Sequence, residues 1–206
     1  MSGIIAQNTL DSSGLIKSPE GGGAWNFIKK LTASGSSDLS FVDGTDDVVL
    51  DSTYKIYVFT FNNIHPETDN MTFQFNLSID SGSNYNVAKT TTFITAYHGE
   101  SDAGGALIYK ESADLAEGTG GQNLSGPLGN GNDECVSGYL HLFNPSSTTF
   151  IKHFMSSFAT YNEADYTDNG HGGGYGNTTS AVDAIQFKMS TDNIDAGDIC
   201  LYGISS

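Results

Sequence analysis

The chain has 206 residues, a length that fits one domain, and it contains no apolar window of about 18 residues that would cross a membrane. Its 24 acidic and 8 basic side chains give a formal net charge of −16. That sign disfavours nucleic acid and anionic membrane surfaces as partners, because Lys and Arg make the contacts to phosphate. The acidic excess is typical of an exposed, self-repelling protein, and cation binding is the lesser alternative.

The first segment, residues 1–23, is predicted to be a flexible N-terminal arm in front of a single domain, residues 24–206. It is rich in Gly and Ser and ends in three consecutive glycines, which hold regular structure poorly. Its small apolar groups favour an arm that docks on a neighbouring chain. The segment lacks the basic and apolar regions of a secretory signal, so we expect the chain to be made in a cytoplasm.

From residue 24 onward, apolar residues recur with a period of two, which predicts strands. The predicted strands are 24–33, 37–42, 47–50, 54–61, 72–79, 90–98, 137–144, 148–158, 184–190 and 199–204. The stretch 54–61 is apolar on both faces and predicts a central strand. No convincing helix is present, and the many short strands predict an all-β antiparallel sandwich, jelly-roll-like in connectivity.

Turn composition predicts two hairpins and two long loops. Residues 144–147 join the strands 137–144 and 148–158 in a tight turn. Strand 184–190 is expected to pair with the closing strand 199–204 across residues 191–197. Two Gly-rich segments, 114–136 and 159–180, are predicted loops, and loops of that length in a compact domain are typically functional or disordered.

The second of these predicted loops carries the candidate contact residues Tyr161, Tyr166, His171 and Tyr175. Tyrosine rings present flat apolar faces with a polar tip, so these side chains are candidates for binding a glycan or another subunit. A subunit interface, or a cover over one end of the sandwich, is favoured over glycan binding.

Metal and catalytic chemistry receive little support from the sequence. Asp43, Asp46 and Asp47 surround a glycine and are weak Ca²⁺ candidates, but a turn between strands explains them better, and no cofactor is expected. The acidic stretch 192–198 is interpreted in the same way. His141 and His153 lie on the two strands of the first hairpin, where cross-strand packing is favoured over zinc binding.

The chain contains two cysteines, Cys135 and Cys200, and no Cys-x-x-Cys motif. Two separate reduced thiols are favoured, and one disulfide between them is the alternative in an oxidising compartment.

The closing segment FKMSTDNIDAGDICLYGI, residues 187–204, resembles the end of many tailed-phage structural proteins. In those proteins a strand, a turn with Ala-Gly or Ser-Gly and a final LYGI-like strand complete a β-sandwich domain. The segments GYLHLFNPSSTTFIKHFMS, residues 138–156, and SIDSGSNYNVAKTTTFITAYHGE, residues 78–100, resemble the same group, which we associate with marine phages.

This resemblance implies a virion structural protein without enzymatic activity, and an accessory capsid decoration (cement) protein is the first expectation. A tail fibre or spike component, or a carbohydrate-binding module that uses residues 159–180, is the alternative, and a glycan-cleaving enzyme ranks last. The implied partners are further copies of the chain, as a homotrimer or larger ring, and other virion proteins such as the major capsid protein. The implied location is the virion, and the family pattern supplies no catalytic residue.

Overall fold

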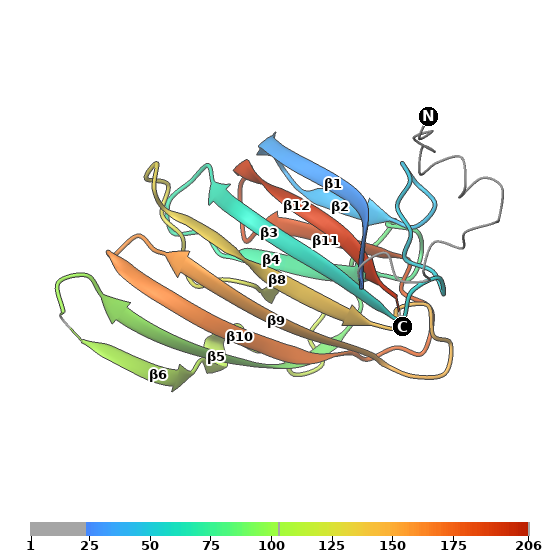
Figure 1. Cartoon of the computed structure of the whole chain (residues 1–206). Coiled ribbons are helices and arrows are strands. Elements are labelled where there is room, and N and C mark those ends of the chain that lie inside the picture. The colour runs from blue at the N-terminus through green and yellow to red at the C-terminus, as the bar shows by residue number, and fades with distance from the viewer. Residues whose placement is uncertain (1–23, 103, 206) are drawn as a thin grey trace, which may run out of the picture.

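The computed structural model describes residues 24–102 and 104–205, so the predicted arm, residues 1–23, lies outside the described residues. Two antiparallel sheets pack face to face (Figure 1), which confirms the predicted all-β sandwich. Sheet A has eight strands in the order β1-β12-β3-β8-β9-β10-β5-β6, and sheet B has four in the order β2-β11-β4-β7. The jelly-roll connectivity stays a prediction.

The strands have the following bounds. Sheet A contains β1 (Trp25–Ser36), β3 (Ile56–Pro66), β5 (Lys89–Gly99), β6 (Gly105–Tyr109), β8 (Cys135–Phe143), β9 (Lys152–Tyr161), β10 (Tyr166–Gly176) and β12 (Ile194–Ile204). Sheet B contains β2 (Leu39–Val42), β4 (Phe73–Ser78), β7 (Gln122–Asn123) and β11 (Ala184–Met189). A 3-10 turn, η1 (Glu111–Ala113), is the only helical element among the described residues, and no helix there could cross a membrane.

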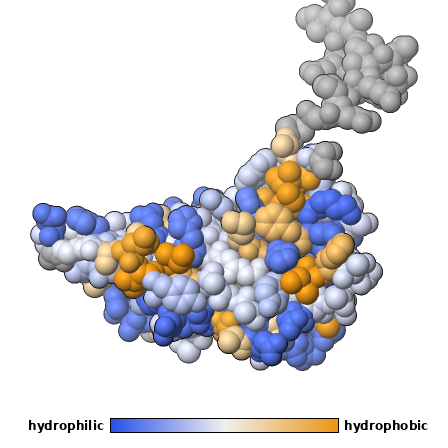
Figure 2. All heavy atoms as spheres, turned by 90° about the horizontal axis from the view of Figure 1, so that it is seen from below, coloured by the Kyte–Doolittle hydropathy of each residue, from blue (hydrophilic) through white to orange (hydrophobic). Residues whose placement is uncertain are grey.

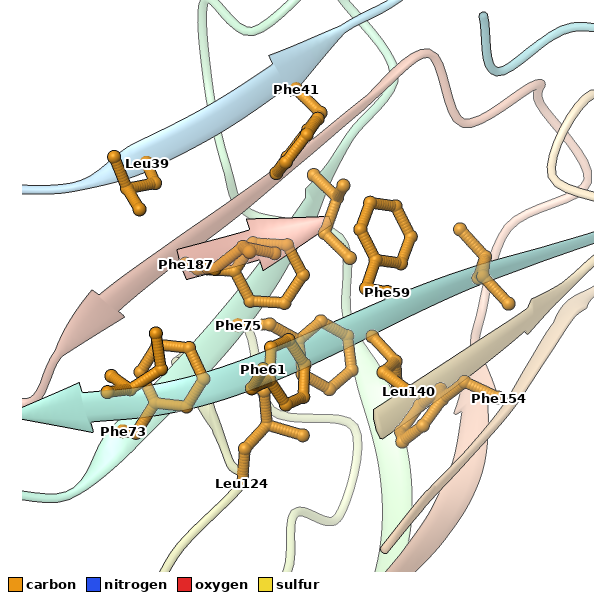
Figure 3. Close-up of a cluster of buried hydrophobic side chains, with 14 of the residues drawn as sticks. Leu39, Phe41, Phe59, Phe61, Phe73, Phe75, Leu124, Leu140, Phe154 and Phe187 are labelled. Atoms are coloured by element: carbon orange, nitrogen blue, oxygen red, sulfur yellow. The ribbon is translucent and has the colours of Figure 1, made fainter. Parts of the chain in front are cut away.

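Aromatic rings from both sheets form the centre of the core (Figure 3). The ring of Phe187 on β11 has its centroid 5.2 Å from Phe59, 5.3 Å from Phe61, 5.9 Å from Phe73 and 6.1 Å from Phe41. Edge-to-face and offset contacts at these separations stabilise beyond the area that they bury. The alternating phenylalanines of β3 and β4 therefore join sheet A to sheet B.

Several sequence predictions about strands are confirmed. β8 and β9 form the predicted hairpin, with Leu142 opposite Phe154. β3 lies between β12 and β8 and is buried on both faces, since neither Val58 on one face nor Phe59 on the other is exposed to solvent. The closing strand buries Ile199 and Leu201 as its alternation predicts. The loop 114–136 is largely irregular, with only β7 and the first residues of β8 inside it.

The predicted hairpin between strand 184–190 and the closing strand is wrong. β11 pairs with β2 and β4 in sheet B, whereas β12 pairs with β1 and β3 in sheet A. Residues 190–193 carry the chain across the ~10 Å between the two sheets. The acidic stretch 192–198, predicted to be a turn, lies mostly within β12, whose register against β3 is irregular there. Hydrophobic alternation is the same whether two successive strands pair or change sheets.

The predicted loop 159–180 is also wrong, because most of it is strand. β9 continues to Tyr161, and every residue of β10 is paired with β5. The glycines of β10 are explained by atoms of neighbouring strands that lie close to them, and not by a loop conformation. A Cβ atom on Gly170 would lie 1.9 Å from the Phe158 ring, and one on Gly174 would lie 2.3 Å from the carbonyl oxygen of Thr90. Glycine within a strand marks such places.

The predicted strand 47–50 is not a strand, although its apolar residues do join the core. Val48 and Leu50 are buried, and the segment lies in an irregular connection after β2. Two apolar residues separated by one position suffice to fill a core from a loop, so the short alternation was not specific to a strand.

Candidate functional site

The outer face of sheet A, which points away from sheet B, is the principal candidate surface. Successive side chains of a strand point to opposite faces, and the inward set of β8 and β9 is buried, as Leu140 and Phe154 show. The outward set on the five central strands is Ile56, Val58, Thr60 and Asn62 on β3; Cys135, Ser137, Tyr139, His141 and Phe143 on β8; His153, Met155, Ser157, Ala159 and Tyr161 on β9; Thr167, Asn169, His171, Gly173 and Tyr175 on β10; and Thr90, Thr92, Ile94, Ala96 and His98 on β5.

Strand register aligns these side chains in rows that run across the whole sheet. One row runs through Lys30, Cys200, Thr60, Tyr139, Ser157, His171, Ile94 and Tyr109. The next row runs through Phe27, Tyr202, Val58, His141, Met155, Gly173 and Thr92. Residues from distant parts of the sequence therefore form one continuous surface.

Aromatic rings on this face gather in three groups. Near β1, the Tyr202 centroid lies 5.4 Å from Trp25 and 5.7 Å from Phe27. On β8, the His141 centroid lies 5.2 Å from Tyr139 and 6.1 Å from Phe143. Between β9 and β10, the centroids of His153 and Tyr175 are 6.2 Å apart. Large rings remain accessible, with Trp25 49%, Phe27 60% and Tyr139 44% exposed.

The outward positions of the five central strands contain no carboxylate and no lysine. None of their outward side chains, all within the described residues, is Asp, Glu or Lys, although the chain has 24 acidic and 8 basic residues. Four of the chain's five histidines lie here: His98, His141, His153 and His171. Burial lowers the pKa of His141, so this imidazole stays neutral at pH 7. The face is suited to apolar and hydrogen-bonding contact at neutral pH.

The structure places the four contact residues predicted from the sequence on two different faces of sheet A. His171 and Tyr175 lie on the outer face, two rows apart on β10, and Tyr161 lies on the same face at the end of β9. The Tyr161 hydroxyl donates to Asp165 at 2.9 Å, which raises the pKa of Tyr161 to about 12. Tyr166 points to the opposite face, where its ring lies 5.8 Å from that of Tyr97. The four side chains therefore do not form a single site.

The two histidines of the hairpin are not a directly opposed pair. His141 lies opposite Met155 in the register of β8 and β9, while the ring of His153 lies beside that of Tyr175 on β10. Both are on the outer face, where they contribute to the aromatic groups. Their common face is what the alternation of the two strands predicts, and their neighbours depend on the register.

A polar hollow beside the outer face brings together residues that sequence reasoning did not connect. Its volume is about 380 Å³, and its lining includes Asn63, His65, Asn132, Asp133, Cys135, Asp195 and Ala196. The Nε2 atom of His65 lies 3.0 Å from the carbonyl oxygen of Gly131, and its Nδ1 atom lies 3.4 Å from Asp195. No spacing in the sequence signals this set, because it joins β3, β8, β12 and the loop before β8.

The chemistry of this hollow is that of a structural polar cluster. The imidazole of His65 faces a backbone carbonyl and a carboxylate, so it is oriented by Gly131 and Asp195 rather than by the thiol. Burial and the nearby charge of Asp133 raise the pKa of Cys135, which keeps it a thiol at neutral pH. A nucleophilic cysteine needs the opposite shift.

The three aspartates proposed as Ca²⁺ candidates act in the connection after β2. Asp43 accepts a 2.8 Å hydrogen bond from the amide of Leu50, and Asp46 and Asp47 adopt the left-handed backbone conformation of turn residues. Within residues 24–102 and 104–205, no group of three or more His, Cys, Asp or Glu side chains is placed to hold a metal ion.

Cys135 and Cys200 are both free and lie on β8 and β12, with β3 between them. Two strand spacings of ~4.8 Å exceed the ~7 Å limit on Cα separation in a disulfide.

Comparison with protein-family models, curated protein sequences and solved structures finds no match. The structure itself therefore defines only the class of the protein, an antiparallel β-sandwich whose outer face carries no Asp, Glu or Lys on five neighbouring strands.

Proposed function

We propose that this chain is a non-enzymatic structural protein of a tailed-phage particle, and specifically an accessory capsid decoration protein. It acts by surface contact, through the outer face of sheet A, with another virion protein such as the major capsid protein. Its place of action is the virion.

The observation that carries the proposal is the absence of Asp, Glu and Lys from the outward positions of β3, β8, β9, β10 and β5, in a chain of net charge −16. The exposed rings of Phe27 and Tyr139 and the exposed thioether of Met155 add apolar area to that face. Depletion of charge with enrichment of aromatic residues and Met is the composition of protein interface cores.

The segments that resemble phage proteins supply part of the same outer face. The phage-like segment 138–156 contains most of β8 and the start of β9, segment 78–100 contains β5, and segment 187–204 contains β12. These strands supply much of the outer face.

The test uses particles from a phage whose gene for this chain is deleted, to which purified chain is added back. We expect the wild-type chain to bind at regular positions in an electron-microscopy map of the particle. Met155→Lys and Tyr139→Lys place a charge on the outer face and should reduce binding at least about tenfold, since an unpaired charge in an interface core is costly.

Phe150→Lys is the matched control, because Phe150 is 67% exposed in the turn between β8 and β9, outside the rows of the outer face. It should bind as the wild type does. A chain that does not bind particles, or equal loss with all three variants, would contradict the proposal.

Attachment to a glycan, as a fibre component or carbohydrate-binding module, is the second candidate. The favouring observation is the accessible rings of Trp25, Phe27 and Tyr139 on an open face. Titration with host surface polysaccharide should then change the fluorescence of Trp25, the chain's single tryptophan, and Tyr139→Ala should weaken binding. Polysaccharide binding without particle binding would favour this candidate over decoration.

A further inference from the structure

The β6 edge of sheet A is exposed on both faces. All five residues of β6 are exposed, including Leu107 at 74%, Ile108 at 38% and Tyr109 at 50%. The β5–β6 end of sheet A projects past sheet B (Figure 1), and Figure 2 shows an apolar patch on this projecting part. β6 pairs with β5 on one side, and it is the last strand of sheet A among the described residues. Its other edge presents backbone N–H and C=O groups to solvent.

The two edges of sheet A differ in the features that prevent them from pairing with another sheet. β1, the opposite edge, contains Lys29 and Lys30 and a register shift between Phe27 and Lys29. Lysine residues and bulges are the devices by which proteins prevent sheets from joining at their edges. β6 has the sequence GALIY, with no charge and no proline, and its register with β5 is regular. The unprotected edge is therefore β6.

We propose that β6 pairs antiparallel with β6 of a second copy of this chain, about a two-fold axis at Leu107, so that two A sheets become one. Leu107 then lies opposite Leu107 of the second copy, and Ala106 lies opposite Ile108 of the second copy. Apolar pairs form on both faces of the joined sheet, and the edge backbone groups of both strands gain partners.

The charges around each edge agree with this pairing. β6 itself carries no charged side chain, so pairing with a second copy opposes no like charges along the strand. Pairing β1 with β1 would instead place Lys29 and Lys30 of one copy against the same lysines of the other. Five residues form a small contact, so we expect a dissociation constant in the micromolar range.

The inference stands apart from the proposed function, because it concerns backbone pairing at the edge of β6 rather than contact through the outward side chains of the five central strands. It predicts an even number of copies, unlike the homotrimer that the phage resemblance implies. The two-fold contact is isologous, since each copy presents the same strand.

Sedimentation equilibrium of the full chain over a range of concentrations tests the pairing. We expect a monomer–dimer equilibrium for the wild type. Leu107→Lys should raise the dissociation constant at least about tenfold, because a lysine on an edge strand opposes pairing. Leu107 is 74% exposed, so the variant should unfold at the wild-type temperature.

Met155→Lys and Phe27→Lys are matched controls, since both residues are 60% exposed on the outer face but not on β6. Each should dimerise within about twofold of the wild type, because substitutions away from a contact seldom affect it. Loss of the dimer with Met155→Lys would indicate face-to-face stacking and would overturn the proposal. A wild-type chain that stays monomeric, or a trimer, would overturn it as well.

Cross-linking provides a second measurement that does not depend on weakening the dimer. In a chain with Cys135→Ser and Cys200→Ser, Leu107→Cys should form a disulfide-linked dimer on mild oxidation, because the two-fold axis brings position 107 of both copies together. Met155→Cys in the same background should remain a monomer. If both variants cross-link equally, or neither does, the pairing at β6 is wrong.

Discussion

Lys89 and Lys152 lie on either side of Gly176, on β5 and β9, and both side chains point into the sandwich. Both residues are fully buried, and the oxygens that accept hydrogen bonds from them are amide and backbone carbonyl oxygens. The Nζ atom of Lys89 donates to the side-chain oxygen of Asn76 and, at 2.9 Å, to the carbonyl oxygen of Val87. Lys152 donates to two backbone carbonyls. Buried amines held by neutral oxygens are costly to charge.

The first prediction concerns the pH dependence of stability. Burial lowers the pKa of Lys89 from 10.5 to about 8, so between these pH values the unfolded chain binds more protons than the folded chain. The contribution of Lys89 to the free energy of unfolding should therefore be fully present above 10.5 and be lost, by about 3 kcal/mol, as the pH drops from 10.5 to 8. Urea unfolding across this range measures the slope.

Lys89→Met should remove that component of the slope, because it leaves no group to titrate. Lys188→Met is the matched control, since Lys188 is exposed on β11. An unchanged slope in Lys89→Met would show that the Lys89 amine is not the source.

The second prediction concerns the glycines of β10. Gly170→Ala should destabilise the fold by about 1–3 kcal/mol, because the new methyl group would overlap the Phe158 ring, which is stacked on Phe93. Gly173→Ala is the matched control, since the nearest atom to its added Cβ is 3.7 Å away. Urea unfolding should separate the two variants. Equal effects would mean that strand propensity, rather than the Phe158 ring, requires glycine.

The third prediction concerns the aromatic core of Figure 3. Phe187→Ala should lower the free energy of unfolding by about 3–5 kcal/mol, because it removes a buried ring that contacts both sheets. Phe150→Ala, at an exposed position, should change it by less than about 0.5 kcal/mol. Denaturant unfolding followed by Trp25 fluorescence checks both variants. Similar losses would contradict the placement of Phe187 at the sandwich centre.

The fourth prediction concerns the thiols. Unfolded without reductant, the chain should show two free thiols, because β3 separates Cys135 from Cys200. In the folded chain, alkylation of Cys135 should be slow at neutral pH, since burial and the charge of Asp133 raise the pKa of its thiol. The rate should increase only when the pH exceeds the pKa of an ordinary cysteine thiol. Peptide mass spectrometry after iodoacetamide treatment measures both. Rapid labelling of Cys135 at pH 7 would contradict the raised pKa.

The sequence predicts most strands correctly because alternation is a local property. Phe73, Phe75 and Leu77 on β4 and Ile199 and Leu201 on β12 are buried as their spacing indicates. The many short strands with turn residues between them likewise predict the all-β sandwich. These features depend on residues close together in the chain, whose pattern is visible without knowing any partner strand.

The tertiary structure alone decides which strands pair and what each face carries. The glycines of β10 looked like a loop because their need for space comes from Phe158 and Thr90 on neighbouring strands. β11 and β12 separate into two sheets although their alternation fits a hairpin. The outer face, its four histidines and the open β6 edge arise from register between segments far apart in sequence, and long-range pairing of that kind leaves no local signal.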